Sequence, residues 1–125
     1  MEGSQIVPNP VVHFEIIGPD APALQRFYAD LFGWKVDADN EWNYGMVETG
    51  GEGGIPGGIG ADPSGASRST VYVSVDEPQN YLEKAKSLGA IELMPETDMG
   101  IVTIAMFSDP AGNVTGLVKS GNGGG

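Results

Sequence analysis

The stretch GPDAPALQRFYADLFG, residues 18–33, recurs in outline as SVDEPQNYLEKAKSLG at residues 74–89. Each copy holds an Asp, a Pro two positions later, a row of apolar residues and a final Gly. Asp can cap the start of a helix, Pro is tolerated in the first turn, and Gly suits the left-handed position at the end. The repeat therefore predicts two helices, each with an Asp cap and one side to bury.

Patterns typical of β-strands surround both helices. One strand precedes each helix and three candidates follow it. The expected strands are 11–17, 34–38, 41–49 and 55–61 in the first half, and 70–75, 90–94, 100–107 and 113–119 in the second. The weakest of these is 55–61, because glycine and proline are poor strand formers. The chain is therefore predicted to have an α+β fold built from two βαβββ modules.

We expect one structural domain with five segments. They are an N-terminal arm (1–10), a first βαβββ module (11–61), a linker (62–69), a second βαβββ module (70–119) and a disordered tail (120–125). At 125 residues the chain is long enough for one hydrophobic core but not for two independent domains.

Composition narrows the class of protein. The chain has no cysteine, which excludes a disulfide framework and a thiolate metal site. Its 17 acidic and 6 basic residues give a formal net charge of -11, which repels nucleic acid and favours a cationic ligand, although solubility alone also explains it. Neither an export signal nor a long apolar run is evident. We expect a cytoplasmic protein that binds neither nucleic acid nor a membrane.

The first strand, VVHFEII at residues 11–17, has two different faces. Alternate side chains of a strand share a face, so Phe14 and Ile16 point to the same side. His13, the chain's only histidine, stands on the other side with Glu15. The pattern therefore separates a polar pair from an apolar row.

The second module offers a matching polar row. When the first strands of the two modules are aligned on their apolar faces, Thr70 and Tyr72 take the places of His13 and Glu15. A sheet that is covered by helices on one face can leave its other face free. We therefore expect His13 and Glu15 to face a cavity, with Tyr72 beside them.

Aromatic and thioether side chains complete the set of candidate ligand contacts. Trp42, Tyr44 and Met46 alternate along one expected strand and should share a face. Such groups suit flat organic ligands, although ordinary packing or a dimer seam would produce the same pattern. Met99 and Met106 could help to line the mouth of the cavity.

Four stretches carry a resemblance to a known superfamily. They are HFEI (13–16), RFYADLFGWKV (26–36), PGGIGA (56–61) and SDPAGNVTGLVK (108–119). Together with the doubled βαβββ module, they resemble the vicinal oxygen chelate (VOC) superfamily, which includes glyoxalases, bleomycin-resistance proteins and extradiol dioxygenases. The resemblance implies a cup-shaped, eight-stranded mixed sheet with the helices on its outer face, and a homodimer.

The same resemblance bears on metal binding. In metal-dependent members the ligands come from the first and last strands of each module. His13 matches one ligand position, whereas Thr70 or Ser69 stands at the second, Gly116 replaces the usual Glu at the third, and the fourth falls near Gly60. Metal sites generally need at least three protein ligands. Even with Glu15 as an added ligand the set is incomplete, so no cofactor is expected, and a divalent metal would need ligands that the pattern does not reveal.

Two functions therefore stay open. The first is a metal-independent small-molecule-binding protein, similar to the drug-sequestering members of the superfamily, with a planar or cationic ligand. The second is a glyoxalase-like or natural-product-tailoring enzyme, of lyase, isomerase or dioxygenase type, that uses His13 and Glu15 as an acid/base pair. The same residues are also consistent with a hydrogen-bonded polar pair that has no catalytic role, or with a dimer whose cavity is vestigial.

Overall fold

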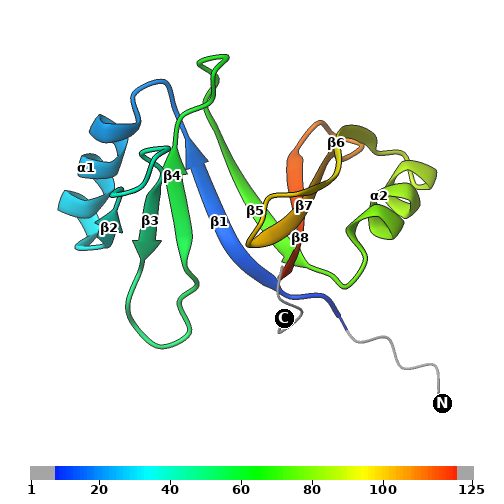
Figure 1. Ribbon diagram of the computed structural model, residues 1–125, viewed down its shortest axis with the longest axis horizontal. Helices are drawn as coiled ribbons and strands as arrows, with labels where there is room; N and C mark the ends of the chain where they lie inside the picture. Colours follow the sequence, from blue (N-terminus) through cyan, green and yellow to red (C-terminus); the bar gives the residue numbers. More distant parts are fainter. Residues whose placement is uncertain (1–7, 121–125) are drawn as a thin grey trace. The chain divides into compact units, whose positions relative to one another are not determined.

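A computed structural model describes residues 8–120 of the chain (Figure 1). The elements are β1 (Val11–Ile17), α1 (Ala21–Phe32), β2 (Lys35–Asp37), β3 (Gly45–Glu48), β4 (Gly57–Gly60), β5 (Arg68–Ser74), α2 (Pro78–Ser87), β6 (Ile91–Asp98), β7 (Val102–Ser108) and β8 (Val114–Ser120). Two βαβββ modules follow one another, so this prediction is confirmed. The expected arm as far as residue 7 and the tail beyond residue 120 lie outside the described residues.

The strands are hydrogen-bonded in the order β2-β3-β4-β1-β5-β8-β7-β6, in one open sheet. β1 pairs with β4 in parallel, while the β2–β3, β3–β4, β6–β7 and β7–β8 pairs are antiparallel, which makes the sheet mixed. Contacts divide the chain into two compact units, and β5 passes from one to the other after Tyr72. We call residues 12–72 the N-terminal unit, and residues 8–11 with 73–120 the C-terminal unit.

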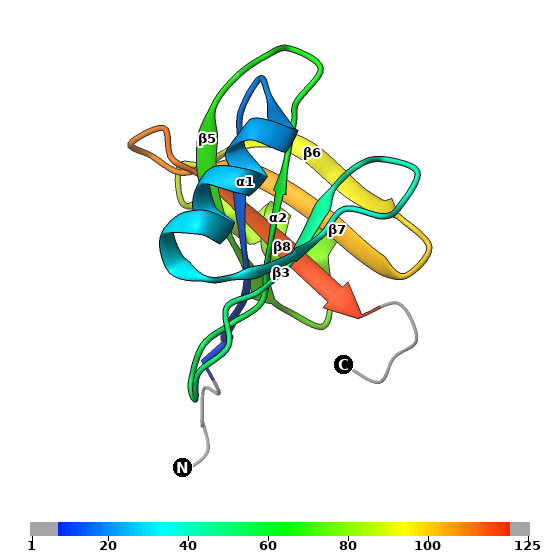
Figure 2. The same cartoon turned by 90° about the vertical axis from the view of Figure 1, so that its left-hand side faces the viewer.

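In the N-terminal unit, α1 lies beside β2, β3 and β4 (Figure 1 and Figure 2). Its start is capped as expected, because the Asp20 carboxylate accepts a hydrogen bond of 3.1 Å from the Ala23 amide. It ends at Gly33, whose φ of 73° is the left-handed conformation that glycine favours. Val47 and Ile59 are fully buried in this unit. Ile59 is paired with Ile16 of β1 and with Gly45, where an added Cβ would meet Gln25 of α1. The alternate positions of β1, which hold the polar pair, therefore lie on the face that α1 does not cover.

The glycine-rich segment forms strand β4, and large aromatic rings lie against its glycines. An added Cβ at Gly57 would stand 2.3 Å from the Phe14 ring, and one at Gly58 would stand 1.8 Å from the Tyr44 hydroxyl. These are closer than any side chain tolerates, so the two glycines give the rings of neighbouring segments the space that side chains would fill. The sequence pattern indicated only a weak strand here, because it does not reveal the rings that pack against these glycines.

The segment before β3 differs from the prediction. A strand was expected from residue 41, but β3 begins at Gly45. The side chain of Asn40 accepts hydrogen bonds from the amides of Trp42 and Tyr44, and Asn43 has a φ of 53°. This turn breaks the strand alternation, because a short polar side chain offers the backbone a competing partner. Trp42 is 77 % exposed on the turn, so its expected place in one strand with Tyr44 was wrong.

The C-terminal unit has its own apolar core. Val75, Leu82, Ala105 and Leu117 pack together, and α2 contacts β6, β7 and β8. The expected cap at Asp76 was wrong, since α2 has Glu77 at its cap position and no side-chain cap. An amide of the first turn has a partner outside the helix instead, because the Gln79 amide donates a hydrogen bond of 2.9 Å to the Glu96 side chain. Within the described residues, no helix is long and apolar enough to span a membrane.

Candidate functional site

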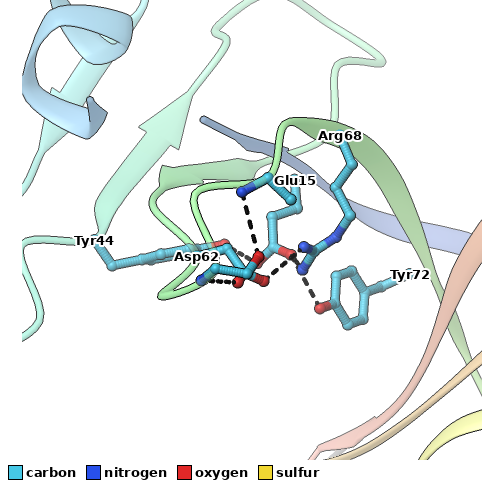
Figure 3. Close-up of polar contacts among 7 residues, drawn as sticks. Glu15, Tyr44, Asp62, Arg68 and Tyr72 are labelled. Carbon is cyan, nitrogen blue, oxygen red and sulfur yellow. Dashed lines mark hydrogen bonds and ion pairs between the residues drawn. The ribbon is translucent and has the colours of Figure 1, made fainter. Parts of the chain in front are cut away.

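Glu15 is the centre of a polar network in the N-terminal unit (Figure 3). Its Oε2 atom accepts a hydrogen bond of 2.9 Å from the Tyr44 hydroxyl. Its Oε1 atom accepts one of 3.2 Å from the Tyr72 hydroxyl and lies 3.5 Å from Nη2 of Arg68. Both carboxylate oxygens are therefore occupied by three donors, one from the segment before β3 and two from β5. We call Glu15, Tyr44, Tyr72 and Arg68, together with His13, the Glu15 network.

Strand register explains how these side chains meet. Glu15 of β1 is paired with Gly58 of β4, so the two positions share a face. Because Gly58 has no side chain, the Tyr44 ring occupies the space next to it and its hydroxyl reaches the carboxylate. On β5, Arg68 and Tyr72 are four residues apart and so also share a face. The site therefore forms because Gly58 leaves room for Tyr44, and because Arg68 and Tyr72 lie on the same face of β5.

His13 lies at the edge of this network and faces away from α1. Its Nε2 atom is 3.2 Å from the Tyr44 hydroxyl, and its ring meets the Tyr72 ring edge-on at 5.6 Å. Phe14, on the opposite face, packs against Trp34 with the ring centres 5.5 Å apart. Burial lowers the pKa of His13 below its usual 6.5, and the nearby Glu15 carboxylate opposes this only in part. His13 is therefore a neutral ring at neutral pH.

The two phenols are held in their protonated form. Burial raises the pKa of both Tyr44 and Tyr72 well above the usual 10.0, and the charge of Glu15 raises each of them further. A phenol that does not ionise beside a carboxylate acts as a fixed donor. Tyr44 and Tyr72 therefore serve the network as hydrogen-bond donors rather than as acids.

Arg68 joins the network to the turn between β4 and β5. Its Nη1 atom is 3.0 Å from Asp62, which also accepts a 2.8 Å hydrogen bond from the Ser64 amide. These Ser64 contacts, with help from Arg68, lower the pKa of Asp62 to about 2. Two carboxylates, of Glu15 and Asp62, thus surround one guanidinium, and the cluster keeps an excess negative charge.

Arg68 and Asp62 are the members of the site that the sequence prediction missed. Arg68 precedes Thr70 and Tyr72 by two and four residues, so strand alternation places all three on one face. That periodicity was a usable signal, but the strand was expected to begin only at residue 70. Asp62 gave no comparable signal, because its role depends on the shape of a turn.

Two polar atoms of β5 are buried without a partner among the described residues. They are the hydroxyl of Thr70, a residue only 3 % exposed, and the Nε atom of Arg68. Arg68 also lines an open groove of about 620 Å³, together with apolar residues such as Ile16, Leu24 and Phe27. The guanidinium therefore connects the Glu15 network with an apolar surface of the same unit.

The other predicted ligand contacts have different surroundings. Met46 of β3 is paired with Gly58 of β4, as Glu15 is, so Met46 and Glu15 share a face of the sheet. Met46 is 51 % exposed. Met99 lies in the turn between β6 and β7, and Met106 is buried within β7. Both belong to the C-terminal unit. The structure thus gathers His13, Glu15, Tyr44, Thr70 and Tyr72 in one unit, adds Met46 to their face, and leaves Trp42 exposed on its turn.

Among the residues that the structure describes, those of the Glu15 network do not form a set of ligands for a divalent metal. Within residues 8–120, no three His, Cys, Asp or Glu side chains come close enough together to hold an ion. Both oxygens of Glu15 are occupied by donors, one of them the cationic Arg68. The Tyr44 ring fills the space that a side chain at Gly58 or Gly60 would occupy, and Gly60 is near the fourth ligand position that the resemblance implies. The donor set therefore lacks the three free ligands that a metal site requires.

Comparison with known proteins identifies relatives. Residues 13–118 match the glyoxalase-like domain family. The chain is 25 % identical over 136 residues to the anthracycline biosynthesis protein DnrV of Streptomyces peucetius. That alignment covers 94 % of this chain but only 50 % of DnrV, so the chain spans about half the length of this relative.

Solved structures share the fold at low sequence identity. A glyoxalase/bleomycin resistance protein/dioxygenase superfamily member from Vibrio splendidus is 13 % identical with a TM-score of 0.61, over 90 % of this chain and 100 % of that one. The methylmalonyl-CoA epimerase of Streptomyces coelicolor is 16 % identical with a TM-score of 0.59, over 92 % and 96 %. Since the family match spans most of the sequence and these structures share its fold, the chain belongs to the glyoxalase-like domain family of this superfamily.

Proposed function

We propose that this protein binds a planar organic molecule without a metal, through the face of the N-terminal unit that carries the Glu15 network. The observation that carries the proposal is the saturation of Glu15 by Tyr44, Tyr72 and Arg68. A carboxylate whose two oxygens are already occupied is a poor base, but it is a rigid anchor for the phenol rings around it. Binding is therefore better supported than chemistry by Glu15.

The ligand class follows from the groups on this face. The Tyr44 ring packs against the glycines of β4, Tyr72 lies beside His13, and Met46 offers an adaptable thioether. Excess negative charge around Arg68 and the net charge of -11 both favour a cation. Similarity to DnrV supports an aromatic natural product of the anthracycline kind. A planar polycyclic compound with an amino group combines these features.

A matched pair of ligands tests this function. We would measure thermal shift and calorimetric binding for an anthracycline with an amino sugar and for its aglycone, which lacks the amine. A ligand that binds only the native state raises the melting temperature, so both should do so, the amine more strongly. Chelator treatment should change neither result. Binding that appears only after a divalent ion is added would contradict the proposal.

Variants locate the binding face. Tyr72→Phe removes one donor to Glu15 and should weaken affinity, as should Met46→Ala, which removes an exposed contact from the same face. Leu93→Ala is a suitable control, because Leu93 is an exposed apolar residue of the C-terminal unit. If Leu93→Ala weakens binding as much as Met46→Ala does, the ligand lies elsewhere.

A second function is supported by one observation, the neutral ring of His13 beside the network. A neutral imidazole can accept a proton, so a natural-product-tailoring reaction through His13 is the alternative. Long incubation with the anthracycline pair, followed by mass spectrometry, separates the two. Recovery of unchanged ligand supports a binding or drug-sequestering role, whereas a product that His13→Ala abolishes without loss of affinity supports the enzyme.

A further inference from the structure

We infer that the Glu15 network fixes the proton of His13 on Nε2, so that Nδ1 is left as a lone-pair acceptor for a donor group of the ligand. The inference deepens the proposed function and rests on it for the ligand. It names the chemistry that the bound molecule must bring to His13, namely a hydroxyl or an ammonium group.

The first step concerns the single proton of Tyr44. Its hydroxyl lies 2.9 Å from Glu15 and 3.2 Å from Nε2 of His13, so it has two neighbours and one hydrogen to give. A carboxylate can only accept, and a charged acceptor makes the stronger bond. The alternative would set the phenol oxygen against the Glu15 carboxylate with no hydrogen between them. Tyr44 therefore donates to Glu15.

The second step follows at His13. Because the Tyr44 proton is committed to Glu15, the phenol oxygen can meet Nε2 only as an acceptor. Nε2 must then carry a hydrogen. In a neutral imidazole one nitrogen is protonated and the other is not, so Nδ1 has a free lone pair.

The third step concerns the surroundings of the ring. Nδ1 makes no hydrogen bond to any residue from 8 to 120. The charged or titratable groups that face the ring are Glu15, through its charge, and the two phenols Tyr44 and Tyr72. Tyr72 meets the ring by its edge and gives its own proton to Glu15. Neither phenol is left to satisfy Nδ1, so this nitrogen is open to water in the free protein and to a donor group of the ligand in the complex.

Nitrogen NMR tests the tautomer in the free protein. The chain has one histidine, so all ring signals of a ¹⁵N-labelled sample come from His13, and the coupling of Nε2 to both carbon-bound ring protons distinguishes it from Nδ1. At pH 8 we expect a protonated-type shift for Nε2 and an unprotonated-type shift for Nδ1. A proton on Nδ1, or equal averaged shifts at both nitrogens, would overturn the inference.

Two matched variants show whether the network is the cause. Tyr44→Phe removes the acceptor of Nε2, so the two ring signals should move toward each other as the tautomers mix. Tyr72→Phe also deletes one hydroxyl from Glu15 but leaves Tyr44 in place, so it should keep the wild-type pattern. Mixing in Tyr72→Phe and none in Tyr44→Phe would contradict the assignment. The spread of amide shifts confirms that each variant is folded.

A ligand titration tests the contact itself. On addition of the amino-sugar anthracycline, the Nδ1 signal should move toward the shift of a hydrogen-bonded nitrogen, while Nε2 changes little. If the ligand binds but Nδ1 does not respond, the contact is refuted. If the tautomer is fixed but no ligand binds, the proposed function fails while the assigned proton on Nε2 stands.

Discussion

The two βαβββ modules share a backbone pattern but not a chemistry. In the first module, Gly58 of β4 lies under the Tyr44 ring, whose hydroxyl donates a hydrogen bond to the Glu15 carboxylate. In the second, Gly116 of β8 is paired with Met106, which is only 8 % exposed and brings no charge. A glycine in the last strand thus supports a polar network in one module and apolar packing in the other. The backbone repeat sets the fold, and a few side chains set the function.

The largest expected effect breaks the special packing of the first module. Gly58→Ala would place a methyl group 1.8 Å from the Tyr44 hydroxyl, so the ring must leave its place over β4. Overpacking of this kind should lower the free energy of unfolding by about 2–3 kcal/mol. Urea denaturation measures it.

A double-mutant cycle provides the control for this change. If the clash with Tyr44 is the cause, Gly58→Ala should cost little when it is added to Tyr44→Ala. A full loss of stability in the double variant would mean that some other neighbour of Gly58 resists the methyl group.

A smaller effect is expected from Glu15→Gln, which removes the charge that faces Arg68. The amide keeps a similar shape but offers one acceptor atom to Tyr44 and Tyr72 instead of two. Because the pair is partly exposed, we expect a loss of about 1–2 kcal/mol in urea denaturation.

The matched control lies in the C-terminal unit. Glu83 pairs with Lys86 at 3.5 Å on the surface of α2, so Glu83→Gln should cost less than about 0.5 kcal/mol. Equal losses at Glu15 and Glu83 would show that the Glu15 network is no stronger than a surface ion pair.

A pH dependence of the N-terminal unit should come next in size. The folded pKa of His13 lies below its unfolded value of 6.5, so the ring is neutral in both states above that pH and has no effect there. As the pH falls from 7 toward 5, the unfolded chain takes up the proton first, and the folded state loses stability. Wild type should therefore lose more stability than His13→Gln over this range.

Parallel urea titrations of the two proteins isolate the effect of His13 and its coupling to Glu15, because the other carboxylates are the same in both. Wild type gaining stability relative to His13→Gln on acidification would reverse the sign and refute the neutral ring.

The smallest expected effect, and the only favourable one, is at Thr70. Its buried hydroxyl has no partner among residues 8–120, so Thr70→Val should keep or raise the unfolding free energy, by up to about 1 kcal/mol. Thr70→Ser keeps the hydroxyl, loses the methyl group, and should cost about 1 kcal/mol. Thermal and urea denaturation compare them. Equal losses in both variants would show that the hydroxyl has a partner, such as a buried water molecule.

The sequence predicted the repeated fold because helix caps, apolar stripes and strand alternation are local patterns. Face alternation also placed His13 and Glu15 together and away from α1. It missed Arg68 because the strand was expected to begin only at residue 70, two positions after the arginine that begins β5. It misplaced Trp42, because the side chain of Asn40 turned the backbone out of the strand.

The packing of the Tyr44 ring against Gly58 limits how such a scaffold could change its chemistry. A carboxylate at position 58 and a phenol at position 44 would compete for one volume, so the protein can hold either group but not both. Loss of the phenol alone would strip Glu15 of a donor and release the imidazole. Conversion of this face into an ion-binding one through position 58 therefore requires the replacement of Tyr44 as well as of Gly58.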